Sequence, residues 1–230
     1  PFPAFCFRVT TQRLKNGGAN RRSNGHASGV RTLSRRTVAI EMAGRAQVYV
    51  ALIHHPVYDK HGRVVTTSLT TLDLSDMARS CRSFGVTAFF IVSPVEAMRA
   101  LARKVLSHWH QGAGRDYNPN RSDALSLVRL AKDLEGVEIE IEADTGKLPV
   151  LVATSARPMA DPVGFADLAA ELEQSQDPHL IMFGTGWGLA DEIVGRSAKR
   201  LEPIAGSGDY NHLSVRAASA VILDRLLGSR

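Results

Sequence analysis

Short apolar runs alternate along this chain with longer segments in which apolar residues recur every three or four positions. The apolar runs predict strands that are buried on both faces, and the periodic segments predict helices that place one face on a core. The predicted strands span residues 48–53, 88–92, 150–153, 179–183 and 200–203. The predicted helices span residues 75–84, 95–110, about 122–134, 165–174 and 213–227, with a short helix from residue 189.

This alternation is typical of an α/β protein with a mostly parallel sheet and helices on both faces. In such sheets, ligands bind beyond the carboxyl ends of the strands. Three predicted strands end in loops rich in glycine and small polar residues, with the sequences VATSAR, FGTGWGL and EPIAGSGDYNHLS. Loops of this composition let backbone groups approach a ligand closely, so their convergence predicts a pocket for one small molecule.

The charge is distributed unevenly along the chain. Residues 1–46 carry nine basic residues and one acidic residue, a net charge of +8, whereas residues 47–230 carry 19 basic and 22 acidic residues, a net charge of −3. The first segment is rich in Arg, Ser, Gly and Asn without apolar periodicity, which predicts a disordered basic leader, either a tail or an upstream extension. A transit peptide is an alternative interpretation. Residues 47–230 are predicted to form one folded domain.

Several classes of protein and site are excluded. No apolar run approaches the ~18 residues that a membrane helix needs, so we expect a soluble protein that does not bind a membrane. The two cysteines, Cys6 and Cys81, are too few for a disulfide scaffold or a multi-cysteine zinc site, which favours a cytoplasmic protein. Cys81 shares a helix face with Met77 and is predicted to lie in the core. The histidines at 54, 55, 108 and 110 have no third ligand in place, so no metal site is expected.

A dinucleotide is one candidate ligand for the predicted pocket. The loop FGTGWGL has glycines at 184, 186 and 188, but Leu189 stands where the third glycine of the dinucleotide fingerprint belongs. Glu202 lies near the position expected for a ribose-binding acid. A dinucleotide-dependent oxidoreductase therefore remains an alternative. A Walker-type phosphate loop is excluded because the chain has no Gly-Lys-Ser or Gly-Lys-Thr sequence.

Five segments of the sequence resemble one protein family. They are YVALIHHPVYDKHGRVVTTSLTTLDLSDMAR, HWHQGAGRDYNPNRSDAL, LVATSAR, FGTGWGLADEI and EPIAGSGDYNHLSVRAASAVILDRLL, and the resemblance extends from residue 47 to residue 227. The family is the SPOUT class of S-adenosylmethionine-dependent RNA methyltransferases. Within this class, the chain looks most similar to the bacterial group related to the tRNA guanine-N1 enzymes. Each glycine loop alone is a weak signal, whereas the combination is specific.

The resemblance implies that S-adenosylmethionine binds in a C-terminal trefoil knot formed by the three glycine-rich loops. The residues of those loops that are implied to hold the cofactor are Thr154, Ser155, Gly184, Gly186, Gly188, Leu189, Ile204, Gly206, Leu213 and Ser214. The resemblance also implies a tRNA or rRNA substrate and a homodimer with an active site completed by both subunits. A non-catalytic RNA-binding module that retains the fold is a further alternative.

The last loop indicates which atom is methylated. Gly208, Asp209 and Tyr210 repeat the Gly-Asp-Tyr of the guanine-N1 branch, in which the aspartate is regarded as the base. His212 replaces the usual Asn of the ribose 2′-O branch. The resemblance therefore favours a base nitrogen as the methyl acceptor. Asp209 is then the candidate proton acceptor, with a helix cap as its alternative role.

Four further side chains are candidates for contact with RNA or cofactor. Arg157 and Arg216 are candidate catalytic residues that contact RNA phosphates or bases, with solvated surface charge as the alternative. Trp187 and Tyr210 are candidates to face the sulfonium or to stack on a flipped base. The alternative for these two aromatic residues is a packing role within the loops.

Overall fold

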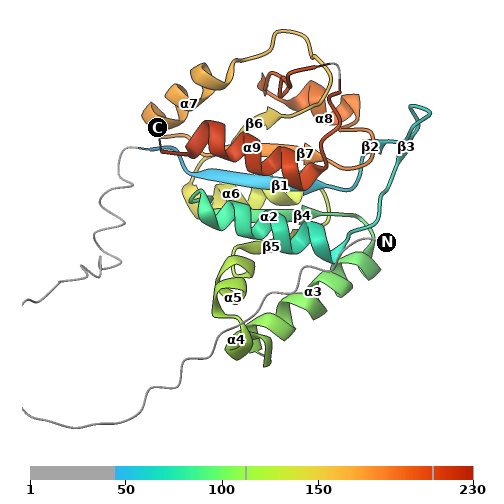
Figure 1. Ribbon diagram of the computed structural model, residues 1–230, viewed down its shortest axis with the longest axis vertical. Coiled ribbons are helices and arrows are strands. Elements are labelled where there is room, and N and C mark those ends of the chain that lie inside the picture. The colour runs from blue at the N-terminus through green and yellow to red at the C-terminus, as the bar shows by residue number, and fades with distance from the viewer. Residues whose placement is uncertain (1–44, 112, 209, 230) are drawn as a thin grey trace, which may run out of the picture.

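The computed structural model describes residues 45–111, 113–208 and 210–229. Within these residues, one sheet of six parallel strands has the order β5-β4-β1-β7-β6-β8 (Figure 1). The strands are β1 (Val48–Ile53), β4 (Ala88–Val92), β5 (Val128–Ala131), β6 (Val150–Ala153), β7 (His179–Gly184) and β8 (Lys199–Arg200). A separate hairpin consists of β2 (Val57–Tyr58) and β3 (Val64–Val65). The predicted α/β class is confirmed, and the trefoil knot stays a prediction.

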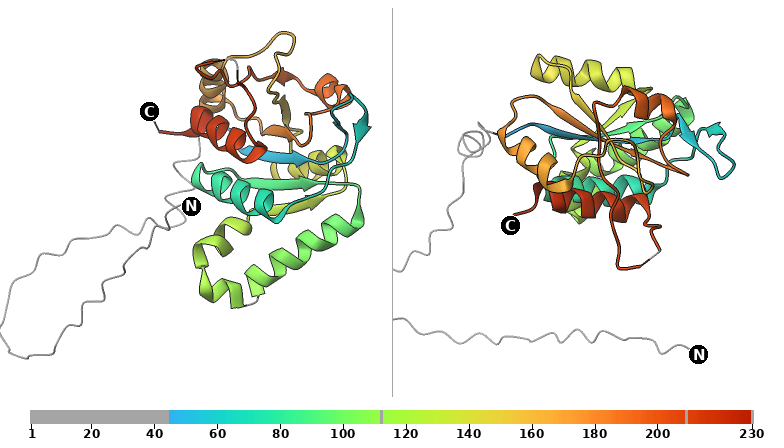
Figure 2. Two further views of the ribbon diagram at one scale, coloured as in Figure 1. Left: turned by 45° about the vertical axis from the view of Figure 1, so that its right-hand side comes forward. Right: turned by 90° about the horizontal axis from the view of Figure 1, so that it is seen from above.

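Helices cover both faces of the sheet (Figure 2). One face packs against α2 (Thr71–Ser83), α7 (Phe165–Gln174) and α9 (Val215–Leu227), together with α3 (Glu96–Gln111) and α5 (Pro119–Leu125). The other face packs against α6 (Leu134–Thr145) and α8 (Asp191–Arg196), while the short α4 (Ala113–Tyr117) joins α3 to α5. None of the helices in the described residues is long and apolar enough to span a membrane.

The central strand β1 shows why apolar runs form this sheet. Successive side chains of a strand point to opposite faces, so a strand that is covered on both faces needs apolar residues at every position. The six residues of β1 are all buried and alternate between the two cores: Val48, Val50 and Leu52 on one side, Tyr49, Ala51 and Ile53 on the other. On α2, Cys81 is fully buried as predicted, and burial raises the pKa of its thiol.

The first described residues already pack against the domain. The backbone N–H of Ala46 donates to the carbonyl oxygen of Leu172 at 2.8 Å. The guanidinium of Arg45 donates to the carbonyl oxygen of Leu226 at 3.4 Å. These contacts tie the start of β1 to α7 and α9. The rest of the predicted leader, residues 1–44, lies outside the described residues.

The predicted helix over residues 122–134 is wrong. In the structure, α5 ends at Leu125, β5 occupies Val128–Ala131, and α6 begins at Leu134. The leucine spacing favours a helix locally, but β5 pairs with β4 and extends the sheet, so tertiary pairing overrides the local pattern. Asp133 then starts α6, because its carboxylate accepts a hydrogen bond from the backbone N–H of Gly136 at 2.9 Å.

The other predicted elements are confirmed, with boundaries that move by at most four residues. The last predicted strand is shorter than expected, because β8 ends at Arg200. Glu202, the proposed ribose-binding acid, instead accepts a hydrogen bond from the backbone N–H of Phe165 at 2.8 Å. Glu202 therefore supplies a hydrogen-bond acceptor for a backbone N–H in the first turn of α7, where Gly164 has no side chain to cap the helix. This contact gives no support to the dinucleotide alternative.

Candidate active site

A cavity of about 530 Å³ is enclosed by loops at the carboxyl ends of the strands. Part of its lining comes from Thr67, Ser68 and Asp73, which follow β3, and part from the loops after β6 and β7. The rest comes from the segment before α9 and from α9 itself: Ile204, residues 211–215, Ala218 and Ile222. The structure brings together nine of the predicted site residues as its lining: Thr154, Ser155, Arg157, Gly184, Gly186, Gly188, Ile204, Leu213 and Ser214. The three glycine-rich loops thus converge, and the role of these residues in binding stays a prediction.

Four predicted site residues are placed differently. Leu189 is buried beneath the loop after β7, where it forms a bridge with Val57. Gly206 and Arg216 are not among the described residues that line the cavity. Asp209, the candidate base, lies outside the described residues.

The loop after β7 is shaped by close backbone contacts. A Cβ at Gly184 would lie 2.5 Å from the backbone nitrogen of Leu189, so only glycine fits there without movement of the loop. Gly186 has a φ of +60°, and a Cβ there would lie 2.8 Å from the carbonyl oxygen of Tyr58. That same oxygen accepts a hydrogen bond from the backbone N–H of Trp187 at 2.9 Å. The β2–β3 hairpin therefore braces this wall of the cavity.

A polar cluster lies beneath this wall. The Nδ1 atom of His54 is 3.1 Å from the hydroxyl oxygen of Thr67, and the hydroxyl groups of Thr67 and Thr185 are in contact. Burial of the imidazole lowers the pKa of His54 to about 4, so it is neutral near pH 7. Both threonines line the cavity, whereas His54 and His55 do not. Across the described part of the chain, no three His, Cys, Asp or Glu side chains are grouped to hold a metal ion.

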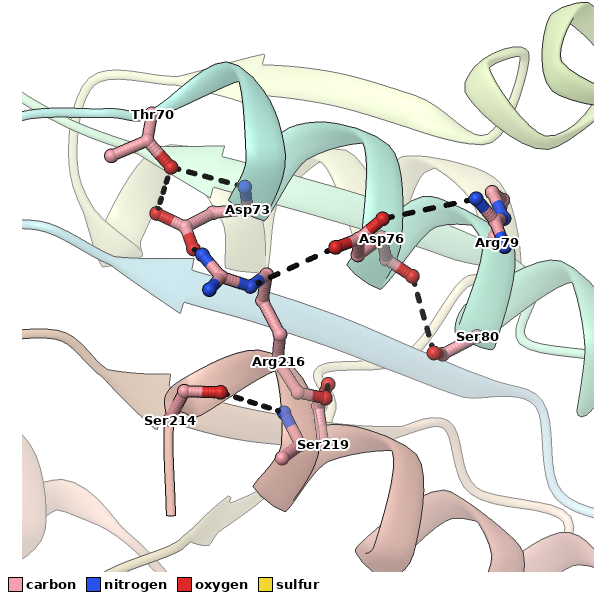
Figure 3. A network of polar contacts seen from close by, with 9 residues as sticks. Thr70, Asp73, Asp76, Arg79, Ser80, Ser214, Arg216 and Ser219 are labelled. Atoms are coloured by element: carbon pink, nitrogen blue, oxygen red, sulfur yellow. Dashed lines mark hydrogen bonds and ion pairs between the residues drawn. The ribbon is translucent and has the colours of Figure 1, made fainter. Parts of the chain in front are cut away.

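A buried carboxylate, Asp73, lines the cavity and belongs to a network of polar contacts between α2 and α9 (Figure 3). One oxygen of Asp73 accepts a hydrogen bond from the hydroxyl group of Thr70 at 2.6 Å, and the other lies 2.8 Å from Nη1 of Arg216. The Nε atom of Arg216 is also 3.7 Å from a carboxylate oxygen of Asp76. Arg216 therefore ties α9 to α2 and neutralises a charge at the edge of the cavity.

Exposed aromatic rings lie in and beside the lining of the cavity. Trp187 and His212 both line it, and their ring centroids are 6.4 Å apart. The ring of Tyr210 lies 6.4 Å from that of His212. Beside them, Nη2 of Arg157 donates to the carbonyl oxygen of Trp187 at 3.0 Å, and Asn211 donates to the carbonyl oxygen of Ala156 at 2.9 Å. These bonds hold the loops after β6, β7 and β8 together.

Sequence reasoning missed the wall that residues 67–73 supply. The spacing of Thr70 and Asp73 is that of a capping box, which signals a helix that begins at residue 71 and an acid in its first turn. No local signal places this segment beside the loop after β7, because that depends on the pairing of β1 with β7. His212 and Asn211 also line the cavity, although neither was predicted to do so.

Comparison with known proteins agrees with this geometry. The family model for SAM-dependent RNA methyltransferases matches residues 47–228, which contain all the segments that line the cavity. A protein of Aquifex aeolicus is 42% identical over 179 residues, which are 78% of this chain and 87% of that protein. These matches confirm the resemblance drawn from the loop sequences.

Two further relatives carry functional names. A tRNA (guanine-N(1)-)-methyltransferase of Oleidesulfovibrio alaskensis is 42% identical over 82% of this chain, and one of Nitratidesulfovibrio vulgaris is 40% identical over 79%. The matched parts are 43% and 42% of those proteins, so the chain spans less than half the length of either.

Solved structures share the fold at low sequence identity. A methylase family protein of Neisseria gonorrhoeae is 16% identical with a TM-score of 0.53, and the match covers 79% of this chain and 82% of that chain. A methylase family protein of Haemophilus influenzae is 18% identical with a TM-score of 0.51, and the match covers 79% of this chain and 65% of that chain. At these identities, the likeness concerns the fold.

Proposed function

This chain belongs to the family of SAM-dependent RNA methyltransferases, and we propose that it transfers a methyl group from S-adenosylmethionine to a base nitrogen of tRNA or rRNA. The observation that carries the proposal is that the three glycine-rich loops of the matched region enclose one cavity at the carboxyl ends of the strands. The names of two relatives make a guanine of tRNA the first acceptor to test.

The residues of the cavity fit the cofactor that the family uses. Backbone groups of the loop from Gly184 to Gly188, with the apolar side chains of Ile204 and Leu213, are suited to hold the flat adenine ring of the cofactor. The bound cofactor supplies an activated methyl group, so the chain has to align the acceptor and remove its proton.

Asp209 is the proposed proton acceptor. The support is the Gly-Asp-Tyr sequence at residues 208–210 and the position of this segment directly before the cavity-lining residues 211–215. Arg157 lines the cavity and is exposed, which suits contact with an RNA phosphate or base. Arg216 is held by Asp73, so we assign it a positioning role between α2 and α9.

A homodimer is also proposed. The resemblance implies that two subunits complete the active site, and residues 47–230 carry a net charge of −3. Of the described residues that line the cavity, only Arg157 is Arg or Lys, so a single subunit offers few cations for phosphate. Sedimentation equilibrium at micromolar concentration should give the mass of two chains, and the mass of one chain would refute the dimer.

The test uses purified protein, methyl-labelled S-adenosylmethionine, and tRNA or rRNA from cells that lack the gene. We expect label in a modified base, identified by mass spectrometry of the nucleosides. Asp209→Asn should keep cofactor affinity and lower turnover by roughly 10²–10⁴-fold, as expected for loss of a general base. Asp116→Asn, at an exposed position of α4, is the matched control and should change neither quantity.

Two results would contradict the proposal. If Asp209→Asn keeps more than about a tenth of the turnover, Asp209 is a helix cap or a spectator, because a general base contributes more than this. If the wild-type protein binds S-adenosylmethionine and RNA but transfers no methyl group, the non-catalytic RNA-binding alternative is favoured.

A further inference from the structure

Three exposed aromatic side chains lie close together, and two of them, Trp187 and His212, line the cavity. Trp187 is 56% exposed and Tyr210 is 80% exposed, and His212, also exposed, lies between them. The ring planes of Trp187 and His212 are inclined by 52°, and those of Tyr210 and His212 by 76°. His212 is therefore near both other rings, and neither pair of rings is stacked face to face.

The loops do not need these rings for their own packing. The backbone of Trp187 makes the structural contacts, because its N–H donates to Tyr58 and its carbonyl oxygen accepts from Arg157. Its indole ring is left more than half exposed. A ring that plugged the loop would be buried, so the packing alternative for Trp187 and Tyr210 is not supported. Exposed aromatic rings at a functional opening are a common feature of binding surfaces.

We propose that Trp187, His212 and Tyr210 form a stacking site for the unpaired RNA base that receives the methyl group. This inference rests on the proposed function and deepens it, because it names the form of the substrate. A base within a duplex cannot reach a cavity of this kind, so the accepted nucleotide is single-stranded or flipped out of its helix. Stacking on aromatic rings suits any base, because every base has a π-face.

Charge around the opening favours a nucleic acid as the occupant. Arg157 lines the cavity directly beside Trp187, to which its guanidinium is bonded. Exposed Lys60 and His61 lie on the β2–β3 hairpin, two and three residues beyond Tyr58, which bonds to the backbone of Trp187. The positive charges of Arg157 and Lys60 suit contact with the phosphates that flank a stacked base. An aromatic site flanked by cations is the arrangement that single-stranded nucleic acids require.

The experiment measures binding of two probes to each variant. The first probe is an unstructured single-stranded RNA oligonucleotide, and the second is S-adenosylmethionine. Trp187→Ala and Tyr210→Ala should each weaken RNA binding roughly 5-fold to 150-fold, the range for loss of one stacking contact, and leave cofactor affinity unchanged. Tyr117→Ala is the matched control, because Tyr117 is 88% exposed on α4, away from the cavity. Melting temperatures should not change in any of these variants.

Fluorescence provides a second measurement. The chain has two tryptophans, so Trp109→Phe leaves Trp187 as the only indole. Single-stranded RNA should quench this fluorescence, and the same sequence in a duplex should not. Trp187→Phe keeps an aromatic face and should recover most of the RNA affinity that Trp187→Ala loses.

The outcomes separate this inference from the proposed function. Unchanged RNA affinity in Trp187→Ala, with methyl transfer intact in the wild type, would overturn the stacking site alone. Equal losses of RNA and cofactor affinity would place the indole against the cofactor and overturn it as well. If the wild-type protein neither binds RNA nor transfers a methyl group, both the stacking site and the proposed function are wrong.

Discussion

The ion pair between Asp73 and Arg216 allows a sharp prediction about stability. The Asp73 side chain is 10% exposed and that of Arg216 is 33% exposed, so the two partners are not equivalent. Arg216→Met leaves a buried carboxylate with the Thr70 hydroxyl as its remaining bond. Asp73→Asn instead leaves a partly exposed guanidinium that still has water and the carboxylate of Asp76. The two substitutions should therefore have unequal costs.

The expected magnitudes follow from this burial. Removal of one partner of a buried pair costs about 3–5 kcal/mol, because the other charge is left uncompensated. Since Arg216 is partly exposed, we expect Arg216→Met to lower the free energy of unfolding by about 3 kcal/mol, the lower end of that range. Asp73→Asn keeps a polar group beside Thr70 and should cost about 1–1.5 kcal/mol, the value of one hydrogen bond.

Urea denaturation followed by circular dichroism measures both changes and the double variant. The double variant should be no less stable than Arg216→Met alone, because the uncompensated charge is then absent. Arg79→Met is the matched control on α2, since Arg79 reaches Asp76 at 3.9 Å and both side chains are exposed (Figure 3). It should change stability by less than about 0.5 kcal/mol. A cost of Arg216→Met no larger than that of Asp73→Asn would refute the reasoning.

Two further predictions concern pH and the glycine loop. The pKa of His54 falls from 6.5 in the unfolded chain to about 4 in the folded one, so the unfolded chain binds a proton that the folded chain does not. The free energy of unfolding should therefore fall by up to about 3 kcal/mol as the pH drops from 6.5 to 4. If the stability of His54→Asn depends on pH in the same way, a group other than His54 causes the effect. Gly184→Ala should weaken cofactor binding at least about 10-fold, a cost of 1.4 kcal/mol, because its Cβ meets backbone at 2.5 Å. Gly195→Ala, on α8 and outside the described cavity lining, has nothing within 4 Å of its added Cβ and is the matched control, and equal calorimetric affinities of the two variants would contradict this account.

The sequence predicted the long strands that are buried on both faces, and it missed β5 and the two-residue strands β2 and β3. In β1, β4 and β7, nearly every position is apolar, so a continuous apolar run in the sequence marks each of these strands. In β5, Arg129 is only partly buried and its guanidinium bonds to Asp144 on α6 at 2.6 Å. A four-residue strand with a charged residue at its second position has no clear period, so only the pairing with β4 defines it.

The parts of the candidate site that lie in glycine-rich loops could be predicted from the sequence. The part that depends on the order of strands in the sheet could not. Glycine-rich loops after three strands predicted most of the lining residues. Thr67 and Asp73 line the same cavity although they are more than 80 residues away from Thr154 in the chain. Their position follows from the place of β1 next to β7 in the centre of the sheet, an arrangement that no short motif specifies.

One residue links the two surfaces on which the proposed function depends. The backbone of Trp187 is bonded to Tyr58 and Arg157 and so forms part of the wall around the cofactor cavity, while the residue as a whole lines the cavity and is 56% exposed. Truncation of this side chain removes the outer surface and keeps both backbone bonds. A substitution at Gly186 moves the same backbone, because a Cβ there meets the carbonyl oxygen of Tyr58 at 2.8 Å, and so disturbs both surfaces. Variants of the ring therefore separate RNA binding from cofactor binding, whereas variants of the neighbouring glycines do not.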